Sequence, residues 1–190
     1  MKFKSLLMII SIIISATAVK IHSVELNENS VYNLDSEWIN QNKESVKLKS
    51  FLGKHVLLAM VYLTCTYSCP AIISQIESIE SKLNPSVKKN LALVLISIDP
   101  DHDTPEKLKE YMMKRKLSPQ KWTMLTAQNE NDVRELAAIL SFKYKKSESG
   151  DYTHSFMIHF LNKEGVIQDV IDKINVDSKI FADKINKDNQ

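Results

Sequence analysis

Two uninterrupted apolar segments, residues 56–63 and 91–98, constrain the fold of this chain most strongly. A strand that reads as a continuous apolar run is typical of a sheet that is covered on both faces. Between the two segments, Ile72, Ile76 and Ile79 recur at the spacing of one helix face. A strand, a helix and a second strand in this order form a βαβ unit, whose strands are parallel. The sequence therefore predicts a parallel pair of strands within an α/β fold.

The rest of the chain continues this pattern. Thr104 and Pro105 are residue types that begin helices, as N-cap and first helical residue. Further predicted elements are a strand at 122–125, a helix around 133–140, a hairpin of 156–161 with 166–170, and a helix at 178–187. A short strand or hairpin is expected around 31–34 and 46–48. Together these elements predict a central mixed sheet flanked by helices.

The chain has two cysteines, Cys65 and Cys69, and Pro70 follows them where the first buried strand turns into the helix. If Pro70 lies in the first helical turn, both cysteines stand at the helix N-terminus, where the free N–H groups and the helix dipole favour thiolate. Disulfide exchange and metal binding both remain open. A purely structural disulfide is the plainer alternative, although so short a loop gains little stability from a bridge. A cysteine site at a strand-to-helix turn of such a sheet is the thioredoxin-like architecture.

The N-terminus has the pattern of an export signal. Lys2 and Lys4 precede an uncharged, Leu- and Ile-rich stretch, and residues 16–18 supply a small-x-small cleavage site. We therefore expect residues 1–18 to be a signal peptide, or else an uncleaved N-terminal anchor. Residues 19–47 are expected to form a lead-in segment, and residues 48–190 a thioredoxin-like domain.

Charge argues against a nucleic-acid partner. The chain has 25 lysines and arginines against 23 acidic residues. Removal of residues 1–18 takes away two lysines and no acidic residue, which leaves 23 basic residues against 23 acidic ones. Binding to phosphate groups needs a basic excess that the mature chain lacks.

One histidine is placed to meet the cysteines. The five histidines are His22, His55, His102, His154 and His159. His154 lies just ahead of the strand that opens the last predicted hairpin, and in a thioredoxin-like fold the loop before that strand faces the cysteine site. A loop histidine taken alone is more often a solvated residue than a ligand. The nearby cysteine pair makes His154 the candidate third member of the site.

With these residues in place, the chain resembles the Sco/SenC family of copper-binding, thioredoxin-like assembly factors of cytochrome oxidase. The motifs that carry the resemblance are residues 52–54, the Cys-x-x-x-Cys-Pro of 65–70, residues 96–105, residues 122–126, His154 with Ser155, and residues 160–165. In that family the two cysteines and the later histidine bind copper. The resemblance therefore implies a copper site of Cys65, Cys69 and His154.

The donor types agree with copper. Two thiolates and one imidazole form a soft, three-coordinate set that suits Cu(I), and Cu(II) would recruit a further ligand. A structural zinc site usually has four protein ligands, and the chain has no third cysteine.

The sequence also departs from the family pattern at two places. Thr66, Tyr67 and Ser68 stand where the family usually places Pro-Asp between the cysteines, and Thr153 stands where an Asp usually precedes the histidine. Loss of an acid beside the histidine removes a hydrogen-bond acceptor that would tune the metal.

Other conspicuous residues have simpler explanations. The acidic segment 99–103 is expected to be a solvated turn that caps the next helix rather than a cation site. Met112 fits the helix core and Met113 its flank, and His159 is expected to pack or lie on the surface. Lys143, Lys145 and Lys146 predict a solvated basic face.

The leading functional hypothesis is an exported copper-binding assembly factor, in the periplasm or on the outer face of the cytoplasmic membrane. It would deliver copper to an oxidase-type copper protein or prepare that client's cysteines, with a thiol-disulfide reductase as a further partner. The alternative is a thioredoxin-like thiol-disulfide oxidoreductase that uses Cys65 and Cys69 as its redox pair. Such enzymes use Cys-x-x-Cys, and three intervening residues fit metal binding better. No peroxidase motif is visible, and a module held by a structural disulfide would not need His154.

Overall fold

The computed structural model describes residues 26–65, 68–148 and 150–187. The predicted export signal lies outside these ranges. Within them, no helix combines the length and the apolar character that a membrane span requires.

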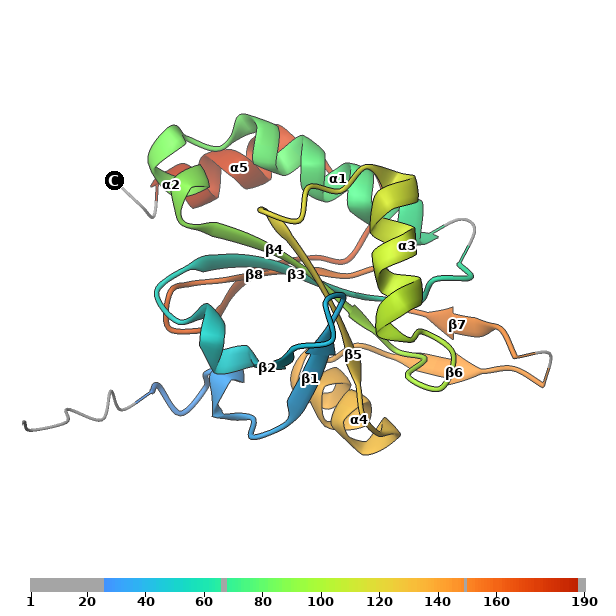
Figure 1. Ribbon diagram of the computed structural model, residues 1–190. Coiled ribbons are helices and arrows are strands. Elements are labelled where there is room, and N and C mark those ends of the chain that lie inside the picture. Colours follow the sequence, from blue (N-terminus) through green and yellow to red (C-terminus); the bar gives the residue numbers. More distant parts are fainter. Residues whose placement is uncertain (1–25, 66–67, 149, 188–190) are drawn as a thin grey trace, which may run out of the picture.

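A seven-stranded mixed sheet forms the centre of the molecule (Figure 1). Its strand order is β2-β1-β5-β4-β3-β8-β9. The strands are β1 (Glu37–Asn40), β2 (Ser45–Lys47), β3 (His55–Val61), β4 (Leu91–Ser97), β5 (Trp122–Ala127), β8 (Ile158–Leu161) and β9 (Ile167–Ile171). The strands β3, β4 and β5 run parallel, whereas β1, β8 and β9 pair antiparallel with their neighbours. The predicted mixed sheet and its parallel pair are confirmed.

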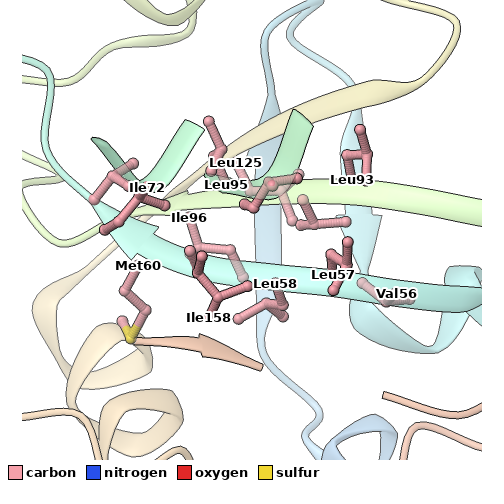
Figure 2. Packing of buried hydrophobic residues seen from close by; sticks show 14 of the residues in the cluster. Val56, Leu57, Leu58, Met60, Ile72, Leu93, Leu95, Ile96, Leu125 and Ile158 are labelled. Atoms are coloured by element: carbon pink, nitrogen blue, oxygen red, sulfur yellow. The ribbon is translucent and has the colours of Figure 1, made fainter. Parts of the chain in front are cut away.

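The two apolar segments are the innermost strands. Every residue of β3 is buried, and β4 is buried except at its first residue. Side chains of β3 and β4 pack together with Ile72, Leu125 and Ile158 (Figure 2). Full burial of such a side chain contributes about 1.5–3 kcal/mol relative to exposure. Burial on both faces explains why these strands read as continuous apolar runs.

Helices cover both faces of the sheet (Figure 1). They are α1 (Ser68–Lys82), α2 (Pro85–Lys89), α3 (Pro105–Arg115), α4 (Glu130–Ile139) and α5 (Ser178–Lys187), together with the 3₁₀ helices η1 (Val31–Asn33) and η2 (Leu48–Phe51). The helices α1, α3 and α5 lie on one face, and α4 lies on the other. Two successive right-handed crossovers, β3-α1-β4 and β4-α3-β5, account for α1 and α3 sharing a face. Thr104 caps α3 as predicted, because its side chain accepts from the N–H of Lys107.

The N-terminal segment differs from its prediction. Residues 31–33 form the 3₁₀ helix η1 rather than a strand, and Ser30 caps it by accepting from the N–H of Tyr32. The hairpin in this part of the chain is β1 with β2, and β1 joins the central sheet beside β5. Trp38 of β1 is fully buried. The alternation of exposed and buried residues in 37–40 covers only four residues, which is too short to identify a strand by periodicity alone.

A second, two-stranded sheet projects from the central one. It consists of β6 (Tyr144–Lys146) and β7 (Tyr152–His154), with Tyr144 opposite His154. The sequence predicted neither strand and placed His154 in a loop. Each strand has three residues and a mostly polar composition, which gives no recognisable alternation.

We predict that Gly165→Ala destabilises the protein more than Gly53→Ala does. Both glycines have positive φ, of 80° and 86°, so an alanine at either position costs about 1–2 kcal/mol in backbone strain. A Cβ at Gly165 would lie 2.5 Å from the ring of the buried Tyr32, whereas a Cβ at Gly53 meets nothing within 4 Å. Overpacking should add about 1–3 kcal/mol at Gly165 only. Equilibrium urea unfolding measures the difference, and equal losses for the two variants would contradict this packing.

Candidate metal centre

The β3–α1 connection places both cysteines. Cys69 is the second residue of α1, and Cys65 lies in the turn before it. Both side chains are buried, with 7% and 1% of Cys65 and Cys69 exposed. The backbone N–H of Cys69 donates to the Cys65 sulfur over 3.3 Å. Pro70 is the third residue of α1, so the predicted position of the pair at the helix N-terminus is confirmed.

The β6–β7 sheet brings in His154. The imidazole stacks on Phe142 at 5.8 Å between ring centroids and meets Tyr62 edge-on at 5.5 Å. Nδ1 lies 2.7 Å from the carbonyl oxygen of Ser155, which can only accept, so Nδ1 carries a proton and donates. In the neutral ring Nε2 therefore has a free lone pair. The backbone and the two aromatic rings fix both the tautomer and the orientation of the ring.

The ligand atoms of Cys65, Cys69 and His154 all lie within 4.8 Å of one another. The Cys65 sulfur and His154 Nε2 are 3.9 Å apart. Metal bonds of about 2.0–2.3 Å place the donors of one ion roughly 3–4 Å from each other, so a small closure of the group would accommodate an ion. In the described ranges this is the one group of three or more His, Cys, Asp and Glu side chains with such spacing. The soft donor set fits a copper ion.

The surroundings favour thiolate at Cys65. The Cys69 thiol is the strongest of several hydrogen-bond donors, with the Ser68 hydroxyl and the backbone N–H of Cys69 among the others, and they lower the pKa of Cys65 to about 3 against the cost of burial. The same hydrogen bond, together with burial, raises the pKa of Cys69. The reduced pair thus shares one proton, which Cys69 holds. A thiolate is the form that ligates metals and attacks disulfides.

Ser68, which the sequence analysis noted only as a departure from the family pattern, belongs to the site. Its hydroxyl oxygen lies 3.0 Å from the Cys65 sulfur and 2.9 Å from His154 Nε2. It is the first residue of α1, one position before Cys69. In the sequence, only the small, hydroxyl-bearing side chain of Ser68 could have indicated that this residue belongs to the site.

The acidic segment 99–103 is not the solvated turn that the sequence analysis expected. Asp99 and Asp103 are buried, whereas Asp101 and His102 are exposed. Asp103 accepts from the hydroxyl of Ser97 at 2.6 Å and from the backbone N–H of Leu63 at 3.1 Å. These donors replace the water that a buried carboxylate loses. The expectation of solvation was wrong for these two carboxylates, because Ser97 at the end of β4 and Leu63 just after β3 supply the partners of Asp103, which local sequence cannot reveal.

Asp99 connects this loop to the sheet that carries His154. Its Oδ1 accepts from the hydroxyl of Tyr152 in β7 at 3.1 Å and from His102 at 2.9 Å. Lys146 of β6 lies 3.5 Å from the same oxygen. A buried carboxylate therefore holds both strands of the β6–β7 sheet against the central sheet. No sequence signal links residue 99 to residue 152.

The remaining candidates behave largely as expected. Met112 is buried in the core, and Met113 is 66% exposed on the flank of α3. His159 is buried in β8 and donates to the carbonyl of Leu140 at 2.9 Å, and burial lowers its pKa. Lys143, Lys145 and Lys146 are exposed. Thr153 is exposed and touches no ligand atom that the structure describes, so the Ser155 carbonyl serves as the acceptor beside the histidine.

Comparison with known proteins agrees with this geometry. The sequence model of the SCO1/SenC family matches residues 25–188. The chain belongs to the SCO1/SenC family. A Bacillus subtilis protein named as a SCO1 homologue is 27% identical over 131 residues, which cover 67% of this chain and 67% of that protein.

Solved structures of the family share the fold. Arabidopsis thaliana ScoI with copper bound superposes with a TM-score of 0.70 at 24% identity, over 80% of this chain and 94% of that one. BsSco is described as a member of the Sco family of cytochrome c oxidase assembly proteins in which a disulfide switch was identified. It matches with a TM-score of 0.66 at 22% identity, over 80% of this chain and 87% of that one. The predicted thioredoxin-like, Sco-type fold is confirmed.

We predict that the buried charge of Asp103 makes stability fall as pH rises. Burial raises the pKa of Asp103 above its ordinary value. Between the unfolded pKa of about 3.9 and the higher folded value, the unfolded chain loses its proton first, which favours unfolding. Asp103→Asn removes this titration and keeps an oxygen acceptor. The stability of wild type relative to Asp103→Asn should therefore decline as pH rises from 3 through the folded pKa.

Urea unfolding between pH 3 and pH 8 measures this decline. Asp101→Asn is the matched control, because Asp101 lies exposed in the same loop. If the difference in unfolding free energy between wild type and Asp103→Asn did not change with pH, Asp103 would carry no buried charge. The same conclusion would follow if the difference between wild type and Asp101→Asn declined equally.

Proposed function

We propose that this protein is an exported copper-binding protein that delivers copper to an oxidase-type copper site or prepares the cysteines of that site. The observation that carries the proposal is the meeting of Cys65, Cys69 and His154 within 4.8 Å. Its membership of the SCO1/SenC family supports copper as the ion, since Arabidopsis thaliana ScoI holds copper. The client is proposed to be an oxidase-type copper protein because BsSco belongs to a family of cytochrome c oxidase assembly proteins.

The ligands favour Cu(I) as the bound form. Two sulfurs and one imidazole suit the soft monovalent ion, and Cu(II) would need at least one further ligand. A three-coordinate ion leaves its fourth position open to an incoming ligand of a client. A hollow of about 320 Å³ lies beside His154, lined by residues of β6 and β7 and by Lys143 and Ser155. This hollow borders His154 but is not lined by either cysteine.

The N-terminal sequence supports a location outside the cytoplasm. Residues 1–18 have the pattern of a signal peptide, with an uncleaved anchor as the alternative. Either outcome would place the domain in the periplasm or at the outer face of the cytoplasmic membrane. There it would meet a membrane-bound oxidase and a thiol-disulfide reductase able to keep the cysteines reduced.

One observation favours a second candidate function. The lowered pKa of Cys65 makes this thiol a strong candidate for disulfide exchange. The protein would then be a thiol-disulfide oxidoreductase, and His154 would not be needed as a ligand. The same atoms support both functions, so experiments on the individual residues must separate them.

We predict that the reduced protein binds one Cu(I) per chain and that all three residues contribute. Cys65→Ser and Cys69→Ser should each abolish tight binding, because one thiolate and one imidazole form too poor a set for Cu(I). Oxidation of the pair to a disulfide should also exclude copper, because both sulfurs must be thiolates to ligate. Anaerobic competition with a chromogenic Cu(I) chelator measures the affinity. Full copper retention by Cys69→Ser, or equal uptake by the oxidised and reduced protein, would refute the site.

We predict that His154→Ala separates a copper carrier from a reductase. A carrier loses one of three ligands, so its Cu(I) affinity should fall at least about tenfold. A reductase reacts through its thiolate and should keep much of its turnover. The paired assay measures Cu(I) affinity and insulin reduction, with Met113→Ala as a control on an exposed side chain of α3. If His154→Ala keeps its copper affinity while wild type reduces insulin rapidly, the oxidoreductase function replaces the copper function.

A further inference from the structure

The hydroxyl of Ser68 lies between two of the three candidate ligands. Its oxygen is 3.0 Å from the Cys65 sulfur and 2.9 Å from His154 Nε2. Cys65 lies in the β3–α1 connection and Ser68 begins α1, whereas His154 comes from the separate β6–β7 sheet, 86 residues after Ser68. The Ser68 hydroxyl thus lies within hydrogen-bond distance of one candidate ligand from each half of the site.

The single proton of this hydroxyl has two acceptors within reach. Nδ1 of His154 donates to the Ser155 carbonyl, which leaves Nε2 as an acceptor in the neutral ring. A Cys65 thiolate is also an acceptor. A hydroxyl can donate only once, so it satisfies Nε2 or the sulfur at a given moment.

A metal ion changes this competition. Ligation occupies the one free lone pair of Nε2, and that nitrogen can then accept no hydrogen bond. The sulfur of a ligating thiolate keeps further lone pairs. The Cys65 sulfur is then the acceptor that remains within reach of Ser68.

We propose that Ser68 is a positioning residue of the metal centre that favours Cu(I) over Cu(II). This inference rests on the proposed copper-binding function and adds a determinant of the oxidation state. In the metal-free protein the hydroxyl donates either to His154 Nε2 or to the Cys65 sulfur, and it donates to the Cys65 sulfur when His154 ligates the ion.

The preference for Cu(I) follows from the charge on sulfur. A hydrogen bond to a thiolate withdraws electron density from it, and hydrogen bonding around a cysteine sulfur is an established means of tuning copper potentials. Cu(II) depends more on donation from the thiolate than Cu(I) does. The hydrogen bond therefore weakens binding of Cu(II) more than binding of Cu(I).

Three variants test the role of the hydroxyl. Ser68→Ala removes it, Ser68→Thr retains it, and Ser74→Ala removes an exposed hydroxyl from the same helix, away from the ligands. Affinities for Cu(I) and Cu(II) are measured by competition with a chelator specific for each ion. We expect Ser68→Ala to shift the ratio of Cu(II) to Cu(I) affinity about tenfold toward Cu(II). That factor equals a potential lower by about 59 mV for one electron.

Spectroscopy adds two readouts. The thiolate-to-Cu(II) charge-transfer band should move to lower energy in Ser68→Ala, because the sulfur electrons lose the stabilisation of the hydrogen bond. In the metal-free protein, the ¹⁵N NMR signal of His154 Nε2 should also shift in this variant. Ser68→Thr and Ser74→Ala should match wild type in both measurements.

The outcomes distinguish this inference from the function on which it rests. If wild type binds no copper, the proposed function fails and this inference fails with it. If wild type binds copper but Ser68→Ala keeps the wild-type affinity ratio, only this inference is overturned. An unchanged His154 Nε2 signal in metal-free Ser68→Ala would also overturn it, because the hydroxyl would then not donate to Nε2.

Discussion

The parallel pairing of β3 with β4 is the constraint on which the rest of the structure depends. The two strands pair in register over seven residues, and α1 must cross from the end of one to the start of the other on one face of the sheet. This crossover fixes where α1 begins. The burial of two apolar strands therefore places the segment that carries Cys65 and Cys69 at this end of the sheet.

His154 depends on a different kind of interaction. The β6–β7 sheet is held by the buried carboxylate of Asp99 and by ring contacts with Tyr62 and Phe142, and its own Tyr144 and Tyr152 are only partly buried against the core. Buried polar contacts of this kind are costly unless each partner is satisfied. The site is therefore assembled from one part that the hydrophobic core holds and one part that polar and aromatic contacts hold.

This difference explains what the sequence could predict. Long apolar runs identify the central strands, because these strands are buried on both faces. The spacing of Ile72, Ile76 and Ile79 identifies α1, because one whole face of the helix is buried. The three site residues were named because the Cys-x-x-x-Cys-Pro pattern and a later histidine are compact signals. The β6–β7 strands, the burial of Asp99 and the bridging hydroxyl of Ser68 depend on contacts between distant segments. Such contacts leave no periodic pattern in the chain.

The two modes of attachment also bear on the transfer of a metal. Segments with few buried apolar contacts open locally at lower free energy than core elements do. Cys69 stands on α1, whose apolar face packs into the core, and Cys65 lies in the turn before it, whereas His154 stands on the two-stranded β6–β7 sheet. If these three residues ligate copper as proposed, the histidine could leave the ion without disturbing the cysteines. This order of release suits a copper carrier, because an incoming ligand could replace His154 while both sulfurs still hold the ion.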